Sequence, residues 1–117
     1  MTPDETTARR VVAPDELERV AAAAARVCAD EPGILVAYLH GSTVRGEPAR
    51  DLDVAVYLDE PSEASRVLAA CERVAAGIER DARPNLPLDV RPLNEAGPGF
   101  RFRVMTEGRR VYERDAD

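Results

Sequence analysis

A chain of 117 residues with 44% hydrophobic content is long enough to bury a core and fits a single globular domain. Its net charge of −6 disfavours nucleic-acid binding, and the absence of lysine excludes any mechanism that needs one. The sequence has neither a basic N-terminal segment followed by an apolar run nor a stretch long enough to span a bilayer. We therefore expect a cytoplasmic protein without membrane contact.

The first elements along the chain are a tail and a helix. Residues 1–12 are polar and mixed, which predicts a flexible tail before one domain over residues 13–117. Pro14 followed by two acids is typical of a helix N-terminus, and Pro32-Gly33 ends the helix. Apolar residues recur at helical spacing on one face: Leu17, Val20, Ala21, Ala24, Val27 and Cys28. The other cysteine, Cys71, lies in a second helical stretch, and both thiols are interpreted as buried, with a disulfide left open.

Two strands follow the first helix. Residues 34–39 are short, apolar and rich in branched side chains, which predicts a buried strand that leads directly into His40-Gly41-Ser42. Residues 52–58 predict a second strand, in which alternation assigns the side chains to two faces. One face carries Leu52, Val54, Val56 and Leu58, and the other carries Asp51, Asp53, Ala55 and Tyr57.

The second half predicts a long helix over residues 61–81, a strand over 86–93, a weak helix over 100–107 and a short strand over 109–113. Pro87 and Pro92 favour an edge position for the third strand. The inner face of the long helix is predicted to carry Val67, Leu68, Cys71, Val74, Ala75 and Ile78. This order of elements predicts an α/β or α+β fold, a small mixed β-sheet flanked by helices.

A glycine-serine pair directly after the first strand is a candidate phosphate-binding turn. Gly41 permits close approach to the backbone, and Ser42 could cap a short helical turn whose N–H groups face an anion. Arg45 could reach the same phosphates. Taken alone, such a pair after a strand is more often an ordinary turn than a phosphate site. The spacing from Gly41 to Gly46 suggests a P-loop, but Glu47-Pro48 replaces the required lysine and hydroxyl residue, so that interpretation is excluded.

Three aspartates are the candidate metal ligands. Asp51 and Asp53 are two positions apart on the second strand, so their carboxylates project from one face about 6.5–7 Å apart along the strand. Such a pair is costly at the end of a buried strand unless a cation lies between, and carboxylate oxygens suit magnesium. Asp89 lies between apolar neighbours in the third strand and joins the cluster if the two strands are adjacent. A third acid beside two metal ligands suits a general base.

The combination of Gly-Ser, Asp-x-Asp and a later aspartate resembles the nucleotidyltransferase superfamily of DNA polymerase beta. The short chain, the stretch at 88–96 and the ending from Gly108 to Tyr112 resemble the minimal nucleotidyltransferases of the MntA antitoxin type. The resemblance implies the polymerase beta-like nucleotidyltransferase fold, with ATP as the substrate. In that antitoxin type the acceptor is a tyrosine of a cognate HEPN-type toxin, which is silenced by adenylylation.

Site roles follow from the resemblance position by position. It implies that Gly41 and Ser42 bind the triphosphate and that Asp51 and Asp53 are ligands of two Mg²⁺ ions. It implies that Asp89 is the third carboxylate, which helps to hold one metal ion and activates the acceptor hydroxyl.

Two departures from the family pattern leave other functions open. Arg50 replaces the serine that commonly precedes the first aspartate, and the loop from Gly46 to Asp51 is shortened. Arg50 could bind phosphate, or could pair with Asp51 or Asp53 and weaken metal binding. One alternative is therefore a catalytically weak module that neutralises its partner by binding. Another is a small-molecule nucleotidyltransferase, and a homo-oligomer is also left open.

Other polar residues have simpler interpretations. His40 is the only histidine, which favours packing over metal ligation. Arg91 shares a strand face with Asp89 and could contact substrate or form a surface ion pair. The one basic cluster, made of Arg101, Arg103, Arg109 and Arg110, is interpreted as a solvated face rather than a contact for an acidic partner.

Overall fold

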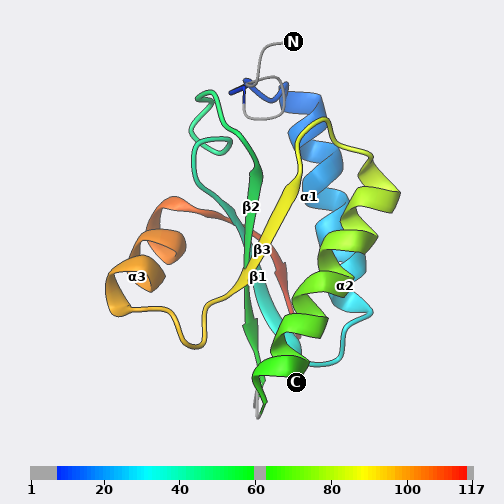
Figure 1. Ribbon diagram of the computed structural model, residues 1–117, viewed down its shortest axis with the longest axis vertical. Helices are drawn as coiled ribbons and strands as arrows, with labels where there is room; N and C mark the ends of the chain where they lie inside the picture. The colour runs from blue at the N-terminus through cyan, green and yellow to red at the C-terminus, as the bar shows by residue number, and fades with distance from the viewer. Residues whose placement is uncertain (1–7, 60–62, 116–117) are drawn as a thin grey trace.

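The sheet at the centre of the molecule has four strands in the order β3-β2-β1-β4, and the helices lie on both of its faces. The structure is a computed structural model that describes residues 8–59 and 63–115. The elements in chain order are α1 (Pro14–Ala29), β1 (Ile34–His40), β2 (Leu52–Leu58), α2 (Ala64–Ala82), β3 (Leu88–Pro92), α3 (Pro98–Glu107) and β4 (Arg109–Glu113). Helices α1 and α2 cover one face of the sheet, and α3 lies on the opposite side (Figure 1). The predicted mixed sheet flanked by helices is confirmed.

Strand pairing places the two acidic strands side by side. β1 pairs antiparallel with β2 and β4, whereas β3 pairs parallel with β2 at the edge of the sheet. A parallel pair needs a long crossover connection, and α2 provides it between β2 and β3. The register sets Asp53 opposite Asp89. The predicted edge position of the third strand is therefore confirmed.

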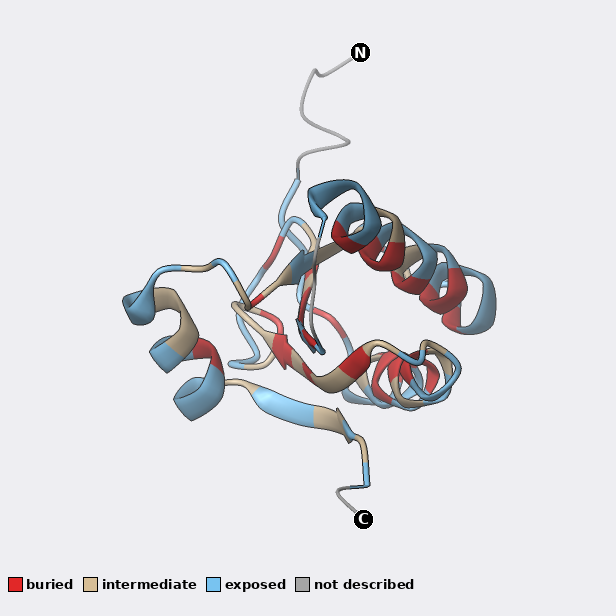
Figure 2. Cartoon of the chain, turned by 90° about the horizontal axis from the view of Figure 1, so that it is seen from below, coloured by how far each residue is buried: buried red, intermediate tan, exposed pale blue. Residues whose placement is uncertain are grey.

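The main core fills the space between the sheet and the helices α1 and α2. The predicted alternation of β2 is confirmed, because Leu52, Val54 and Val56 are fully buried on the helix side. Buried segments gather where the two helices and the sheet face one another (Figure 2). A second, smaller cluster lies under α3 and contains Ala55 and Val104, so both faces of β2 are used.

Several predicted boundaries differ from the structure. Pro61, the predicted start of the long helix, lies outside the described residues, but Glu63 is extended and α2 begins at Ala64. β3 has five residues rather than eight. It begins only at Leu88 because Pro87 has no N–H to donate to the neighbouring strand. The carbonyl of Pro87 still accepts the N–H of Leu52 at 2.8 Å. α3 begins at Pro98, two residues earlier than predicted, because proline fits the first turn.

The predicted inner face of the long helix is wrong at one position. Leu68 is 61% exposed, whereas Ala70 and Gly77 are buried. The buried stripe runs through Val67, Cys71, Val74 and Ile78, and Ala70 and Gly77 are buried along one side of it. The reason is that small residues on this flank allow α1 to approach closely, so leucine is left on the solvent side.

The end of the predicted tail is attached to the domain. Arg10 pairs with Ala49, with two backbone hydrogen bonds of 2.8 Å, and Val12 is buried in the core. The pairing fixes Ala49 just before the acidic strand. The polar composition of residues 1–12 hid this contact, because the pairing uses the backbone rather than apolar side chains.

Both cysteines are buried and free, as the sequence predicts. Burial raises the pKa of the Cys28 thiol to about 12 and that of the Cys71 thiol to about 11. Neither thiol is therefore a reactive nucleophile at neutral pH. None of the helices in the described part of the chain has the length and hydropathy that a bilayer crossing requires.

Gly77 sets the distance between α1 and α2. A Cβ atom at this position would lie 2.8 Å and 2.9 Å from the two methyl groups of Val27. We expect Gly77→Ala to lower the free energy of unfolding by about 1 kcal/mol, because overpacking costs about 1–3 kcal/mol and outweighs a helix-propensity gain of about 1 kcal/mol. Urea unfolding measures the effect.

Two controls identify the cause of this loss. Gly99→Ala, at a helical glycine where an added Cβ meets no atom within 4 Å, should stabilise the protein. In a Val27→Ala background, Gly77→Ala should become neutral or stabilising. An equal loss in both backgrounds would contradict steric contact with Val27 as the cause.

Candidate active site

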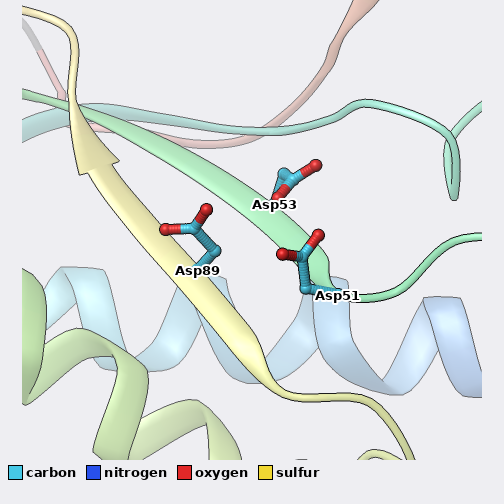
Figure 3. Close-up of side chains that lie close together, drawn as sticks. All are labelled: Asp51, Asp53 and Asp89. Atoms are coloured by element: carbon cyan, nitrogen blue, oxygen red, sulfur yellow. The ribbon is translucent and has the colours of Figure 1, made fainter. Parts of the chain in front are cut away.

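Three aspartates converge at one end of the sheet, on the face opposite α1 and α2. One carboxylate oxygen from each of Asp51, Asp53 and Asp89 lies within 4.8 Å of the others. Asp51 and Asp53 project from the start of β2, and Asp89 projects from the neighbouring β3 toward the same space (Figure 3). The structure thus brings together the three acids that the sequence singled out. Three carboxylates at this spacing are a donor set that fits a hard divalent cation such as Mg²⁺.

The electrostatics of this cluster favour an added positive charge. The pKa of Asp53 is raised from 3.8 to about 7, first by burial, then by its hydrogen bond with Asp51 and by repulsion from Asp51 and Asp89. A carboxyl group with this pKa is about half ionised at pH 7, and a nearby cation would favour its ionised form. A divalent metal ion would therefore relieve the repulsion within the cluster, which agrees with the fit of its donor set.

An arginine contacts the third carboxylate. Arg91 bonds Asp89 through Nε and Nη2, each 3.1 Å from Oδ2. Of the two interpretations left open for Arg91, the structure shows the ion pair. Arg50 is exposed, and among residues 8–59 and 63–115 it forms no ion pair with either Asp51 or Asp53. The guanidinium nearest the carboxylates is therefore that of Arg91.

Gly41 is required by the geometry of the turn after β1. Its φ of +84° lies in the left-handed region, and a Cβ atom there would be 2.5 Å from Oδ2 of Asp53. Only glycine lets the turn lie directly against the carboxylate. The signal that singled out Gly41 was its position after a strand, and the structure supplies the physical reason.

The turn after Gly41 has the helical character that the sequence predicts. Val44, Arg45 and Gly46 each donate a backbone N–H to the carbonyl three residues earlier, at 3.2, 3.1 and 3.2 Å. The N–H groups of Ser42 and Thr43 donate to no backbone carbonyl in the described part of the chain. Free N–H groups at the start of a turn suit an anion. Arg45 is exposed and lies 3.1 Å from Glu47.

Two neighbouring cavities share the wall made by His40 and Phe100. The acidic cavity, about 350 Å³, is lined by His40, Asp51, Asp53, Asp89, Arg91 and Phe100. The basic recess, about 80 Å³, is lined by His40, Gly41, Arg45, Phe100, Arg103, Val104 and Glu107. The two cavities therefore place three carboxylates beside a space lined by two arginines.

His40 packs in this wall, as the sequence favoured. Its ring meets Phe100 edge-on, with centroids 5.5 Å apart and planes at 85°. Burial is the main cause that lowers the pKa of His40, so the ring is neutral at pH 7. Its buried Nε2 has no hydrogen-bond partner within the described residues. A neutral, apolar-packed ring separates the two cavities without adding charge to either.

Sequence reasoning missed Phe100 and Arg103 as site residues. The helix that carries them has no amphipathic pattern, so neither its docking face nor its position could be read from the sequence. Three of the four arginines of the predicted basic cluster contact other side chains. Arg109 forms a bidentate pair with Glu18, Arg110 pairs with Glu113, and Arg101 lies 5.9 Å from the ring centroid of Tyr57. Arg103 alone turns to the basic recess.

This fold and this set of carboxylates define a nucleotidyltransferase. Residues 23–117 match the family described as polymerase beta, nucleotidyltransferase. The chain therefore belongs to the polymerase beta nucleotidyltransferase family. No significant match is found among curated protein sequences.

Solved structures support the same fold. A chain of a mutant MntA toxin–antitoxin complex matches with a TM-score of 0.58 at 18% identity, over 77% of this chain and 70% of that one. A toxin–antitoxin structure with AMP-PNP matches with a TM-score of 0.56 at 17% identity, over 86% of this chain and 73% of that one. A complex of a tri-AMPylated Shewanella oneidensis HEPN toxin with an MNT antitoxin matches with a TM-score of 0.53 at 19% identity, over 76% and 66%. At these identities the similarity is one of fold.

Proposed function

We propose that this nucleotidyltransferase acts in the cytoplasm as an antitoxin that transfers AMP from ATP to a tyrosine hydroxyl of a cognate HEPN-type toxin. The observation that carries the proposal is the convergence of Asp51, Asp53 and Asp89 beside the turn at Gly41. The family membership supports nucleotidyl transfer. The similar solved structures, which include an AMPylated HEPN toxin bound to an MNT antitoxin, support the choice of partner.

The triphosphate would lie along the turn after β1. The free N–H groups of Ser42 and Thr43 would donate to phosphate oxygens, and Gly41 would let the phosphates approach Asp53. Arg45 would contribute its guanidinium from the same turn. We add Arg103, because it lines the basic recess together with Gly41 and Arg45.

The three aspartates would hold two Mg²⁺ ions, with Asp51 and Asp53 as ligands of both and Asp89 as a ligand of one. Bound magnesium supplies neutralisation of phosphate charge and polarisation of the reacting phosphoryl group. Asp89 would accept the proton of the acceptor hydroxyl as the oxygen attacks the α-phosphorus. The new P–O bond forms while the bond to the β-phosphate breaks, and pyrophosphate leaves. Asp51 and Asp53 orient the reacting phosphoryl group.

Intact-mass analysis of a co-expressed HEPN-type partner tests the proposal. We expect the partner to gain the mass of one or more AMP groups when it is expressed with the wild-type chain and no mass when it is expressed with Asp51→Asn. Asp30→Asn, an exposed acid at the C-terminal end of α1, is the matched control and should leave the modification unchanged. An unmodified partner that is nevertheless neutralised by the wild-type chain would contradict transfer.

That contrary outcome is the prediction of a second function, neutralisation by binding alone. The ion pair between Arg91 and Asp89 favours it, because a guanidinium on the third carboxylate opposes metal binding there. Binding alone would survive EDTA and alanine at all three aspartates. Loss of neutralisation by Asp51→Asn with retained binding of the partner would exclude this function.

A further inference from the structure

A third cavity lies at the edge strand β3, whereas the basic recess lies at the end of β1, with β2 between the two strands. This β3–α3 groove, about 360 Å³, is lined by Arg91, Pro92, Glu95, Ala96, Gly97 and Phe100. Arg91 and Phe100 line both the groove and the acidic cavity, so the two cavities are adjacent. Its volume lies within the range of small-ligand sites, about 300–1,000 Å³.

The two sides of the acidic cavity differ in chemistry. The basic recess offers Arg45, Arg103 and the Gly41 backbone, which suit phosphate oxygens. The groove is lined largely by carbon, from Pro92, Ala96 and Phe100, which suits an apolar group. In-line displacement at phosphorus needs the attacking oxygen and the leaving group on opposite sides. If pyrophosphate leaves toward the recess, the acceptor approaches from the groove.

We propose that the β3–α3 groove is the acceptor subsite and that it binds a tyrosine side chain, with the phenol oxygen directed toward Asp89. This inference rests on the proposed function and adds where the acceptor binds and why its hydroxyl is phenolic. An aromatic ring fills an apolar groove and carries its hydroxyl beyond it, whereas a serine or threonine hydroxyl would be drawn into the groove away from Asp89. The phenol proton passes to Asp89, the phenol oxygen bonds to the α-phosphorus, and pyrophosphate leaves with the electrons of the broken bond.

The backbone fixes the groove before any ligand binds. The Asn94 side chain accepts the N–H of Leu58 at 2.9 Å and donates to its carbonyl at 2.7 Å. Leu93 donates its N–H to Val56 at 2.7 Å, and Ala96 donates to Leu93 at 3.1 Å. These hydrogen bonds fix the segment between β3 and α3 to the C-terminal end of β2. A wall fixed in this way lowers the entropic cost of ordering a bound side chain.

Gly97 offers a substitution that fills the groove and disturbs little else. Its φ of −64° and ψ of 158° are accessible to any residue, and an added Cβ meets no atom within 4 Å. Gly99 has the same free space but does not line the groove. Gly97→Leu, at the N-cap of α3, and Gly99→Leu, in its first turn, are thus a matched pair, and thermal unfolding of both variants checks that they fold.

Binding is measured by amide NMR with N-acetyl-L-tyrosinamide as the acceptor probe, on protein saturated with magnesium and AMP-PNP. We expect shifts at Ala96 and Gly97 in the wild-type protein and in Gly99→Leu, and affinity at least about tenfold weaker in Gly97→Leu. AMP-PNP affinity should be equal in all three proteins. N-acetyl-L-serinamide should produce no shifts in the groove.

The outcomes separate this inference from the proposed function. Tyrosinamide shifts located elsewhere, or no shifts up to the solubility limit of the probe, would overturn the acceptor subsite. Weaker AMP-PNP binding in Gly97→Leu would also overturn it, because the groove would then hold the nucleoside. Failure of AMP-PNP to bind the wild-type protein would instead contradict the proposed function. The shifts caused by N-acetyl-L-tyrosinamide would then still show whether the groove binds a tyrosine side chain.

Discussion

Asp53→Asn should raise the melting temperature of the metal-free protein at pH 8 and abolish nucleotidyl transfer. The raised pKa, about 7, shows that the ionised carboxylate is unfavourable in the folded state. Asparagine keeps the shape and removes the charge. The gain in stability is about 1–2 kcal/mol, reduced from the full linkage energy because the group is half exposed to solvent. Transfer should fall about 10³-fold or more, since metal-assisted catalysis contributes several kcal/mol.

The pH dependence follows from the direction of the shift. The folded protein holds the Asp53 proton more tightly than the unfolded chain, whose pKa is 3.8. The contribution of this proton to stability is fully present below pH 3.8 and is lost as the pH rises through about 7. The melting temperature of Asp53→Asn should therefore exceed that of the wild type most at pH 8. The difference between the two proteins should shrink toward pH 5.

Magnesium should reverse the order of stability. Because a ligand that binds only the folded state stabilises it, Mg²⁺ should raise the melting temperature of the wild type at pH 8, and less at pH 5, where a proton competes for Asp53. Asp53→Asn should show a much smaller rise. Asp59→Asn, which removes an exposed carboxylate just beyond β2, is the matched control. Equal magnesium shifts in Asp53→Asn and the wild type would show that the ion binds elsewhere.

Gly41→Ala should slow transfer about 10²-fold, whereas Gly46→Ala should only weaken the fold. Both glycines have positive φ, +84° and +75°, so each alanine costs about 1–2 kcal/mol of backbone strain. A Cβ at Gly41 additionally meets Asp53 Oδ2 at 2.5 Å, while one at Gly46 meets no atom within 4 Å. The displaced carboxylate should cost about 10²-fold in rate, the usual effect of a misplacement of about 1 Å.

Steady-state transfer and thermal unfolding measured on the two variants separate the effects. Both proteins should melt lower than the wild type, with Gly41→Ala the lower of the two. Only Gly41→Ala should lose the magnesium-induced rise in melting temperature. If Gly46→Ala lost transfer to the same degree, strain in the turn rather than contact with Asp53 would be the cause.

The sheet was predictable because its signals are local. The alternation from Leu52 to Leu58 assigns both faces of β2, and the short branched run at 34–39 favours a buried strand. The helix boundaries were less predictable, because Leu68 is apolar yet exposed. Its exposure depends on the close approach of α1 at Gly77, which is a tertiary contact that periodicity does not contain.

The carboxylate cluster was predictable in part. Asp51 and Asp53 share a face by the geometry of any strand, but the position of Asp89 depends on β3 pairing parallel with β2, which the sequence leaves open. The contacts of Arg91 and Phe100 depend on side-chain orientation and on where α3 docks. These follow from the packed structure and have no separate signal in the sequence.

The parallel pairing of β3 with β2 also determines when the carboxylate cluster can form. Asp89 belongs to the edge strand β3. This strand can join the sheet only after the chain has formed the crossover through α2. During synthesis, a nascent chain that ends before Leu88 carries the Asp-x-Asp pair but lacks a complete metal-binding set. The complete carboxylate cluster therefore forms late, after β3, the last strand to pair with β2, has been synthesised.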